Sequence, residues 1–212
     1  MFLGIAALFY IVYLCVSGFT DTTKYIFNKM ELDECMGNIL VAIRNPPKML
    51  MIIKNYHYET RTTTDSKGNT KTERVKVYTH RAEEPFHFVE WIDKSPPPET
   101  LNYVETIHLT RLFTHKIINM SARASGSYEV QKHNFIKRNW RDDHYEYFFD
   151  QTIEGHDAHT LIVNPSRGGW PCYTNEMILI FLDLLVFGYI PRFILDKNSL
   201  RVEFTIEKFI IA

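Results

Sequence analysis

A 19-residue apolar stretch near the C-terminus constrains this chain more than any other feature. Residues 177–195 read MILIFLDLLVFGYIPRFIL, which is long enough to cross a bilayer as one helix. The stretch also holds Asp183, and a carboxylate at the bilayer centre costs about 2.5–3.5 kcal/mol. Gly188 and Pro191 can each break a helix inside it. We therefore interpret residues 172–195 as a membrane segment that either spans or re-enters, with Asp183 as its membrane-embedded polar residue.

The segment that follows favours re-entry. Residues 201–211 alternate apolar and polar side chains, which is the pattern of a strand with one buried face. A lone strand on the far side of a membrane would leave its backbone donors unpaired. We therefore expect residues 196–212 to form a C-terminal strand that returns to the sheet of the main domain. Residues 177–195 would then dip into the bilayer and return, or lie along its cytoplasmic interface, and a straight span is the alternative.

A second apolar stretch opens the sequence. Residues 1–20 carry no charged side chain and predict a transmembrane helix. A signal peptide is the alternative, but it needs a basic residue first and a shorter apolar core. Lys24 and Lys29 follow the stretch, so the positive-inside rule puts the rest of the chain in the cytoplasm. Residues 21–47 then predict a juxtamembrane helix and linker that end at Asn45-Pro46-Pro47.

Between the two stretches, residues 48–171 predict a globular β-rich domain. Its clearest element is a hairpin around the tip Asp65–Gly68, in a register that places Tyr58 opposite Val75 and Tyr56 opposite Val77. Two helices are expected further on, one capped by Ser127 and ending near Asn139, the other from Asp142 to Phe149.

The predicted fold class is therefore an α+β membrane protein. It has a β-rich cytoplasmic domain with one or two helices, flanked by two apolar membrane segments. This interpretation predicts a multi-pass protein of the endoplasmic reticulum or plasma membrane.

Charge is distributed in blocks, although the net charge is only −1. Residues 44–81 hold nine Lys and Arg against three Asp and Glu, and residues 142–157 hold no basic residue against six acidic ones. The basic blocks could face anionic lipids, with Lys48, Lys54, Arg61 and Lys71 as candidate contacts. The alternative, which we favour, is that the blocks pair with each other on a solvated surface. The near-neutral total argues against a nucleic-acid partner.

Few residues suggest catalysis or metal binding. His156, Asp157 and His159 are weak metal candidates, but they lie in a predicted loop and match no established ligand spacing. The three cysteines are widely spaced, which fits a reducing compartment and no disulfide framework. We predict no cofactor and no catalytic residue.

The order of several short motifs resembles the transmembrane protein 151 family across about residues 1–211. The motifs are Tyr56-His57-Tyr58, Thr79-His80, Tyr128-Glu129 before Phe135, Asp142-Asp143, Pro191-Arg192 and Glu207-Lys208-Phe209. The chain departs from the family at Met49–Ile52, where the family has tryptophans. The family also has another membrane helix upstream, which leaves open that an N-terminal piece is missing. The resemblance implies location and architecture, and it supplies no catalytic residues.

Two classes of function follow. The first is an integral membrane protein that presents a cytoplasmic α+β interaction or scaffold domain at the bilayer surface. Its partners would be the lipid bilayer, anionic lipids or an unidentified protein. The second is a membrane-embedded enzyme or ion-pathway component that uses Asp183 or the His156/His159 loop. We favour the first.

Overall fold

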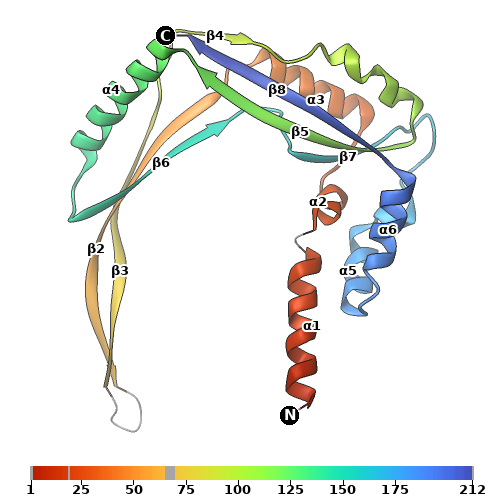
Figure 1. Ribbon diagram of the computed structural model, residues 1–212, viewed down its shortest axis with the longest axis horizontal. Coiled ribbons are helices and arrows are strands. Elements are labelled where there is room, and N and C mark those ends of the chain that lie inside the picture. Colours follow the sequence, from red (N-terminus) through yellow and green to blue (C-terminus); the bar gives the residue numbers. More distant parts are fainter. Residues whose placement is uncertain (1, 19, 65–69, 212) are drawn as a thin grey trace. The chain divides into compact units, whose positions relative to one another are not determined.

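The computed structural model describes residues 2–18, 20–64 and 70–211 and has an α+β fold with two sheets (Figure 1). The chain divides into two compact units, which are described separately. Unit 1 contains Met1–Asn45, Asp93–Ile117 and Glu154–Glu207. Unit 2 contains Pro46–Ile92, Ile118–Ile153 and Lys208–Ala212.

Unit 1 carries most of the helices. They are α1 (Phe2–Gly18), α2 (Asp21–Phe27), α3 (Leu32–Arg44), α5 (Glu176–Leu184), α6 (Tyr189–Asn198) and the 3₁₀ helices η1 (Pro98–Thr106) and η2 (Cys172–Thr174). The prediction of one helix from residue 21 to 45 is wrong, because the chain leaves the helix at Asn28 and forms the short strand β1 (Lys29–Glu31). β1 pairs in parallel with β7 (His159–Val163), which satisfies backbone groups there. The predicted stop before the two prolines is confirmed, since α3 ends at Arg44.

One sheet has five strands in the order β1-β7-β5-β8-β4. The strands not yet located are β4 (Glu90–Asp93), β5 (Leu109–Met120) and β8 (Leu200–Ile211). β5 runs antiparallel to β7. β8 lies between β5 and β4, and Val202, Phe204 and Ile206 are buried as their alternation predicts. The core of unit 1 joins this sheet to helices α2, α5 and α6 through Tyr25, Ile26, Leu109, Leu161, Val163, Leu179 and Leu195.

Unit 2 is built on a three-stranded sheet in the order β3-β2-β6. Its strands are β2 (Lys48–Thr64), β3 (Thr70–Pro85) and β6 (His144–Thr152). Helix α4 (Ala122–Asn139) packs on β2 through Phe135, which meets Met51 and Ile53 in a buried cluster. The N-cap of α4 is Ser121, whose hydroxyl accepts the backbone N–H of Ala124 at 3.1 Å, so the predicted start at Ser127 is wrong.

The prediction of a helix from Asp142 to Phe149 is also wrong, because this segment forms β6. Its register places Tyr147 opposite Ile53 and Phe149 opposite Met51, and both aromatic side chains pack against buried clusters of unit 2. Aromatic residues favour strands when a neighbouring strand gives them a partly buried face. Pairing with β2 therefore determines the structure of residues 144–152.

The hairpin is confirmed, but its predicted register is wrong by one residue. Tyr58 lies opposite Lys76, and Tyr56 lies opposite Tyr78 after a bulge at Asn55/Tyr56. A shift of one residue in the pairing moves the side chains of one strand to the opposite face of the sheet relative to those of its partner. Lys76 therefore lies among the tyrosines, with its ammonium 3.7 Å from the ring centre of Tyr56. The predicted tip at Asp65–Gly68 lies outside the described residues.

The prediction of membrane-spanning segments is wrong as well. Among residues 2–18, 20–64 and 70–211, no helix combines the length and apolar character needed to cross a bilayer. Helix α1 has 17 residues, α5 has nine and α6 has ten, whereas a span needs about 20. The apolar stretch at 177–195 is divided because the chain turns between Leu184 and Tyr189. The predicted fold class is therefore corrected to an α+β fold in which the apolar stretches form short helices.

Candidate functional site

A tight turn joins α5 to α6 and folds the second apolar stretch into a helical hairpin. Val186 takes a positive φ of 66°, which is rare for a β-branched residue. The turn is closed by backbone hydrogen bonds from Val186 N to Asp183 O at 3.0 Å and from Phe187 N to Leu182 O at 2.7 Å. Gly188 follows, and a Cβ there would lie 1.7 Å from a carboxylate oxygen of Asp183. Any larger residue here would displace the Asp183 carboxylate from its present position.

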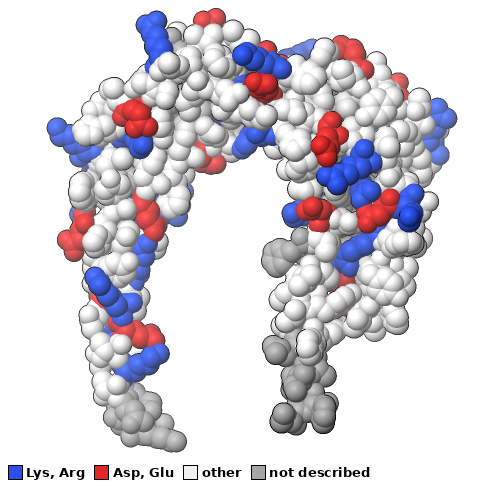
Figure 2. Space-filling view, in the orientation of Figure 1, with Lys and Arg blue, Asp and Glu red and all other residues white. Residues whose placement is uncertain are grey.

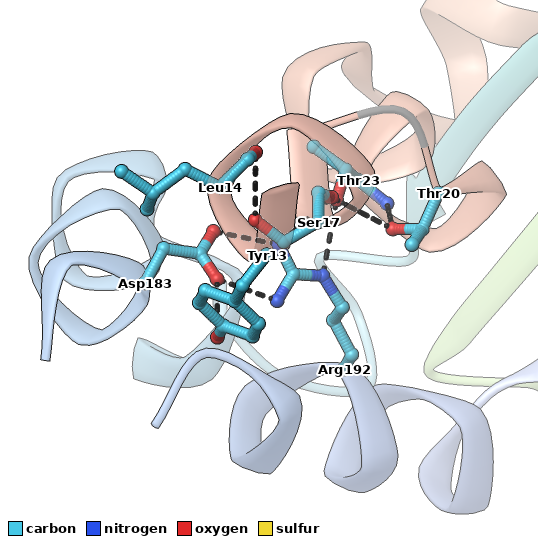
Figure 3. Close-up of polar contacts among 7 residues, drawn as sticks. All are labelled: Tyr13, Leu14, Ser17, Thr20, Thr23, Asp183 and Arg192. Atoms are coloured by element: carbon cyan, nitrogen blue, oxygen red, sulfur yellow. Dashed lines mark hydrogen bonds and ion pairs between the residues drawn. The ribbon is translucent and has the colours of Figure 1, made fainter. Parts of the chain in front are cut away.

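The hairpin brings Asp183 and Arg192 together as a nearly buried ion pair (Figure 3). The guanidinium donates from one nitrogen to Asp183 Oδ1 at 2.8 Å and from another to Oδ2 at 2.6 Å. The side chains are only 10% and 14% exposed, respectively, for Arg192 and Asp183. This two-point geometry is the strongest form of an arginine–carboxylate interaction.

The same arginine also holds the C-terminal end of α1. It donates to the Ser17 carbonyl oxygen at 3.1 Å and, through Nε, to the Thr23 hydroxyl at 3.1 Å (Figure 3). The Tyr13 hydroxyl donates to Asp183 Oδ1 at 3.2 Å. Arg192 of α6 thus donates to a carbonyl oxygen of α1 and to a hydroxyl group of α2, and both helices are far from α6 in the sequence. We call Tyr13, Ser17, Thr23, Asp183 and Arg192 the arginine cluster.

The cluster also explains the polar residue in the apolar stretch. Asp183 and Arg192 are the only charged residues in 177–195, and they lie on either side of a helix-breaking glycine. That pattern was the available signal for a hairpin with an internal ion pair, although the sequence alone did not lead us to pair Asp183 with Arg192. A carboxylate held at both oxygens by a guanidinium is not free to carry an ion or proton. The geometry thus gives no support to an ion pathway at Asp183.

Around the arginine cluster, the helices expose many large apolar side chains. We call this set the apolar surface: Phe9, Ile11, Val12 and Val16 of α1, and Met177, Ile178, Ile180, Phe181, Leu184, Leu185, Val186, Phe187, Tyr189, Ile190 and Phe193 of the hairpin. Met177 is 72% exposed, Phe181 is 61% and Phe193 is 60%. In Figure 2 the described surface of α1 and α5 shows few charged residues. Along the β2–β3 hairpin, by contrast, Lys and Arg (blue) alternate with Asp and Glu (red).

The histidine loop does not assemble into a metal site. His156 Nε2 lies 2.9 Å from the Thr114 carbonyl oxygen, and Asp157 is exposed. His159 begins β7, where its ring lies against those of Tyr25 and Phe113 at 5.1 and 4.8 Å between centroids. Within the described part of the chain, no group of three His, Cys, Asp or Glu side chains could hold a metal ion.

The four basic candidates all lie on β2 and β3 of unit 2. Lys48 begins β2 and is exposed, and the ammonium of Lys54 lies 5.2 Å from the centre of the Phe148 ring. Arg61 lies 3.5 Å from a Glu59 carboxylate oxygen, and Lys71 is paired with Glu73.

Charges from different blocks of the sequence also pair within unit 2. Arg138 contacts Glu84 at 2.7 Å, and Lys76 is paired with Glu146. This pairing is the arrangement expected of a solvated charged surface.

These features define a class: an α+β protein with two sheets and an exposed apolar surface on short helices. Such a surface marks an interaction site for a protein or a membrane. The chain belongs to the TMEM151 family, whose model matches residues 1–211, so the resemblance seen in the sequence is confirmed. The family name denotes transmembrane proteins, and membership accordingly indicates a membrane protein. Comparisons with curated proteins and with solved structures gave no match.

Proposed function

We propose that this protein is a membrane-attached interaction module that inserts the apolar surface of unit 1 into one leaflet of a bilayer. The observation that carries the proposal is the gathering of exposed apolar side chains on α1, α5, α6 and the turn between α5 and α6. Contiguous apolar surface of this kind marks a membrane or protein interaction site, and each large apolar side chain moved out of water contributes about 1.5–3 kcal/mol.

The arginine cluster makes shallow insertion feasible. Asp183 and Arg192 are the only charged residues in 177–195, and their opposite charges neutralise each other. An unpaired charge at the same place would oppose transfer into the apolar region of the bilayer. The hairpin can therefore present Phe181, Leu185 and Phe187 to lipid while its polar groups remain satisfied.

We place the protein on the cytoplasmic side of the endoplasmic reticulum or plasma membrane. Cys15, Cys35 and Cys172 are all free thiols, which is typical of a reducing compartment. Unit 2 would serve as the interaction domain. Its Tyr58 and Tyr78 are 42% and 53% exposed, and exposed tyrosines are favoured in protein interfaces. Lys48 and Lys54 would add a salt-sensitive attraction to anionic lipids, whereas Arg61 and Lys71 contact Glu59 and Glu73 and would add less.

Vesicle binding by the full chain tests the proposal. The double variant Phe181→Asp/Phe187→Asp is expected to bind phosphatidylcholine vesicles about 100-fold or more weakly than wild type, because two large apolar contacts are replaced by charges. Val89→Asp introduces a charge at a side chain that is 90% exposed in unit 2 and serves as the matched control. Unchanged binding by the double variant, or an equal loss in the control, would contradict the proposal.

A further inference from the structure

Strand β6 forms an open edge of the sheet in unit 2. The order β3-β2-β6 places it last, and within the described part of the chain it pairs only with β2, in a register without shifts from His144 to Thr152. An edge strand presents a row of unpaired backbone N–H and C=O groups that can receive another strand. The outer edge of β6 is therefore a surface to which a further strand can be added.

β6 lacks the features that usually protect such an edge, which are prolines, bulges and lysines. Residues 144–152 read HYEYFFDQT and contain no proline, glycine, lysine or arginine. The other edge strand of this sheet, β3, differs in each respect. Its pairing with β2 is interrupted by the bulge at Asn55/Tyr56, it ends at Pro85, and it carries four Lys and Arg side chains. Of the two edges, β6 is thus the one suited to pairing.

Helix α4 leaves room for a strand beyond β6, because it lies over the middle of the sheet. Phe135 packs against Met51 and Ile53 of β2, and the same cluster includes Ala82 of β3 and Tyr147 of β6. A helix that contacts all three strands from one face is centred near β2, and neighbouring strands lie about 4.8 Å apart. A strand added to β6 would therefore lie beside α4 and not beneath its axis.

The side chains of β6 are complementary to those of a second β6 that runs antiparallel to it. When the pair is centred on Tyr147, His144 lies opposite Asp150 of the second copy, and both side chains are exposed. Tyr145 then lies opposite Phe149, and Tyr147 lies opposite its own counterpart. By symmetry the histidine–aspartate pair and the tyrosine–phenylalanine pair each occur twice. Aromatic pairs and pairs of opposite charge are the cross-strand contacts that stabilise antiparallel sheets.

The neighbouring registers are unfavourable. A pair centred on Phe148 places Glu146 opposite Asp150, and a pair centred on Glu146 places that carboxylate opposite its own counterpart. Like charges directly opposite each other destabilise a sheet. The acidic residues of β6 therefore select the register centred on Tyr147.

We propose that two copies of this protein associate through β6 in this register. The two three-stranded sheets become one sheet of six strands in the order β3-β2-β6-β6-β2-β3, with both α4 helices on the same face. The partner is thus a second copy of this chain. The inference goes beyond the proposed membrane attachment and does not depend on it, since every residue involved lies in unit 2.

Sedimentation equilibrium of the full chain in detergent micelles measures the association, and wild type is expected to form dimers. His144→Asp places a carboxylate opposite Asp150 at two symmetric positions and should weaken dimerisation about tenfold or more. Adding Asp150→Lys to this variant restores opposite charges across the pair and should recover most of the loss. A monomeric wild type, or a double variant that dimerises no better than His144→Asp, would overturn the proposal.

Thr72→Asp is the matched control, because it places the same new charge at an exposed position on the other edge strand, β3. We expect it to dimerise as wild type does. Weaker dimerisation by Thr72→Asp together with unchanged dimerisation by His144→Asp would place the contact on β3 and overturn the assignment to β6.

Disulfide cross-linking tests the register directly. In a background with Cys15→Ser and Cys172→Ser, a His144→Cys protein is mixed with an Asp150→Cys protein that carries a mass tag. Cα atoms of directly opposite residues lie about 4.5–5.5 Å apart, which a disulfide can bridge. Mild oxidation should therefore cross-link the mixture, whereas neither protein alone should cross-link, because identical positions lie about 20 Å apart in this register. Cross-linking of either protein to itself, or no cross-linking in the mixture, would overturn the proposed pairing.

Discussion

Replacing Arg192 with leucine is expected to lower the free energy of unfolding by about 3–5 kcal/mol, which is the usual effect of leaving one member of a buried ion pair without its partner. The Arg192 side chain is 10% exposed, and it donates hydrogen bonds to Asp183, Ser17 and Thr23 at once. Its loss leaves the nearly buried Asp183 carboxylate without its cationic partner, although the Tyr13 hydroxyl still donates to it. Chemical denaturation in detergent micelles, followed by circular dichroism, measures the change.

Two further variants show whether the pairing itself is responsible. The double variant Asp183→Leu/Arg192→Leu should recover much of the lost stability, because no charge then remains buried. Arg201→Leu removes an arginine whose partner Glu203 is well exposed, and it should cost less than about 1 kcal/mol. An Arg192→Leu protein as stable as Arg201→Leu would show that the buried ion pair does not hold α1 to the hairpin.

Replacing Phe135 with alanine is expected to destabilise unit 2 by about 3–5 kcal/mol, as large aromatic truncations in packed cores do. The side chain is 1% exposed and forms a cluster with Met51 and Ile53, so it is a fully buried apolar contact between α4 and β2. Hydrogen exchange on the full chain should show faster exchange in β2 and β6 than in β7, which belongs to unit 1.

Val130→Ala is the matched control, because Val130 lies on the same helix and is 62% exposed. We expect it to change the stability by less than about 0.5 kcal/mol, as surface substitutions usually do. Similar losses for Phe135→Ala and Val130→Ala would mean that α4 does not pack on the sheet through the Phe135 face.

Local patterns in the sequence predicted the elements that are decided locally. The alternation in residues 201–211 predicted β8 and its buried face, and two prolines predicted the end of α3. The β2–β3 hairpin was predicted from its flanking strands. Its register differs by one residue from the predicted one, which places Lys76 between the tyrosines.

Elements decided by tertiary partners could not be predicted in the same way. Residues 144–152 form β6 because β2 offers a free edge to pair with, and nothing in their own sequence required it. Residues 29–31 leave a helical pattern because β7 offers a parallel partner. The arginine cluster has the same origin: Asp183 and Arg192 meet only because the chain turns at Val186–Gly188 and returns along α1.

The most direct test of membrane attachment is the depth of the apolar surface in vesicle-bound protein. Nitroxide labels would be placed by Phe181→Cys and Phe187→Cys, and the control label by Tyr103→Cys on η1, in a background with Cys15→Ser and Cys172→Ser. Buried Cys35 can remain, since it is 3% exposed. We predict that lipid-soluble oxygen relaxes the labels at 181 and 187 far more than a water-soluble nickel complex does, and that the reverse holds at 103. Strong nickel relaxation at 181 and 187 in bound protein would contradict membrane insertion of this surface.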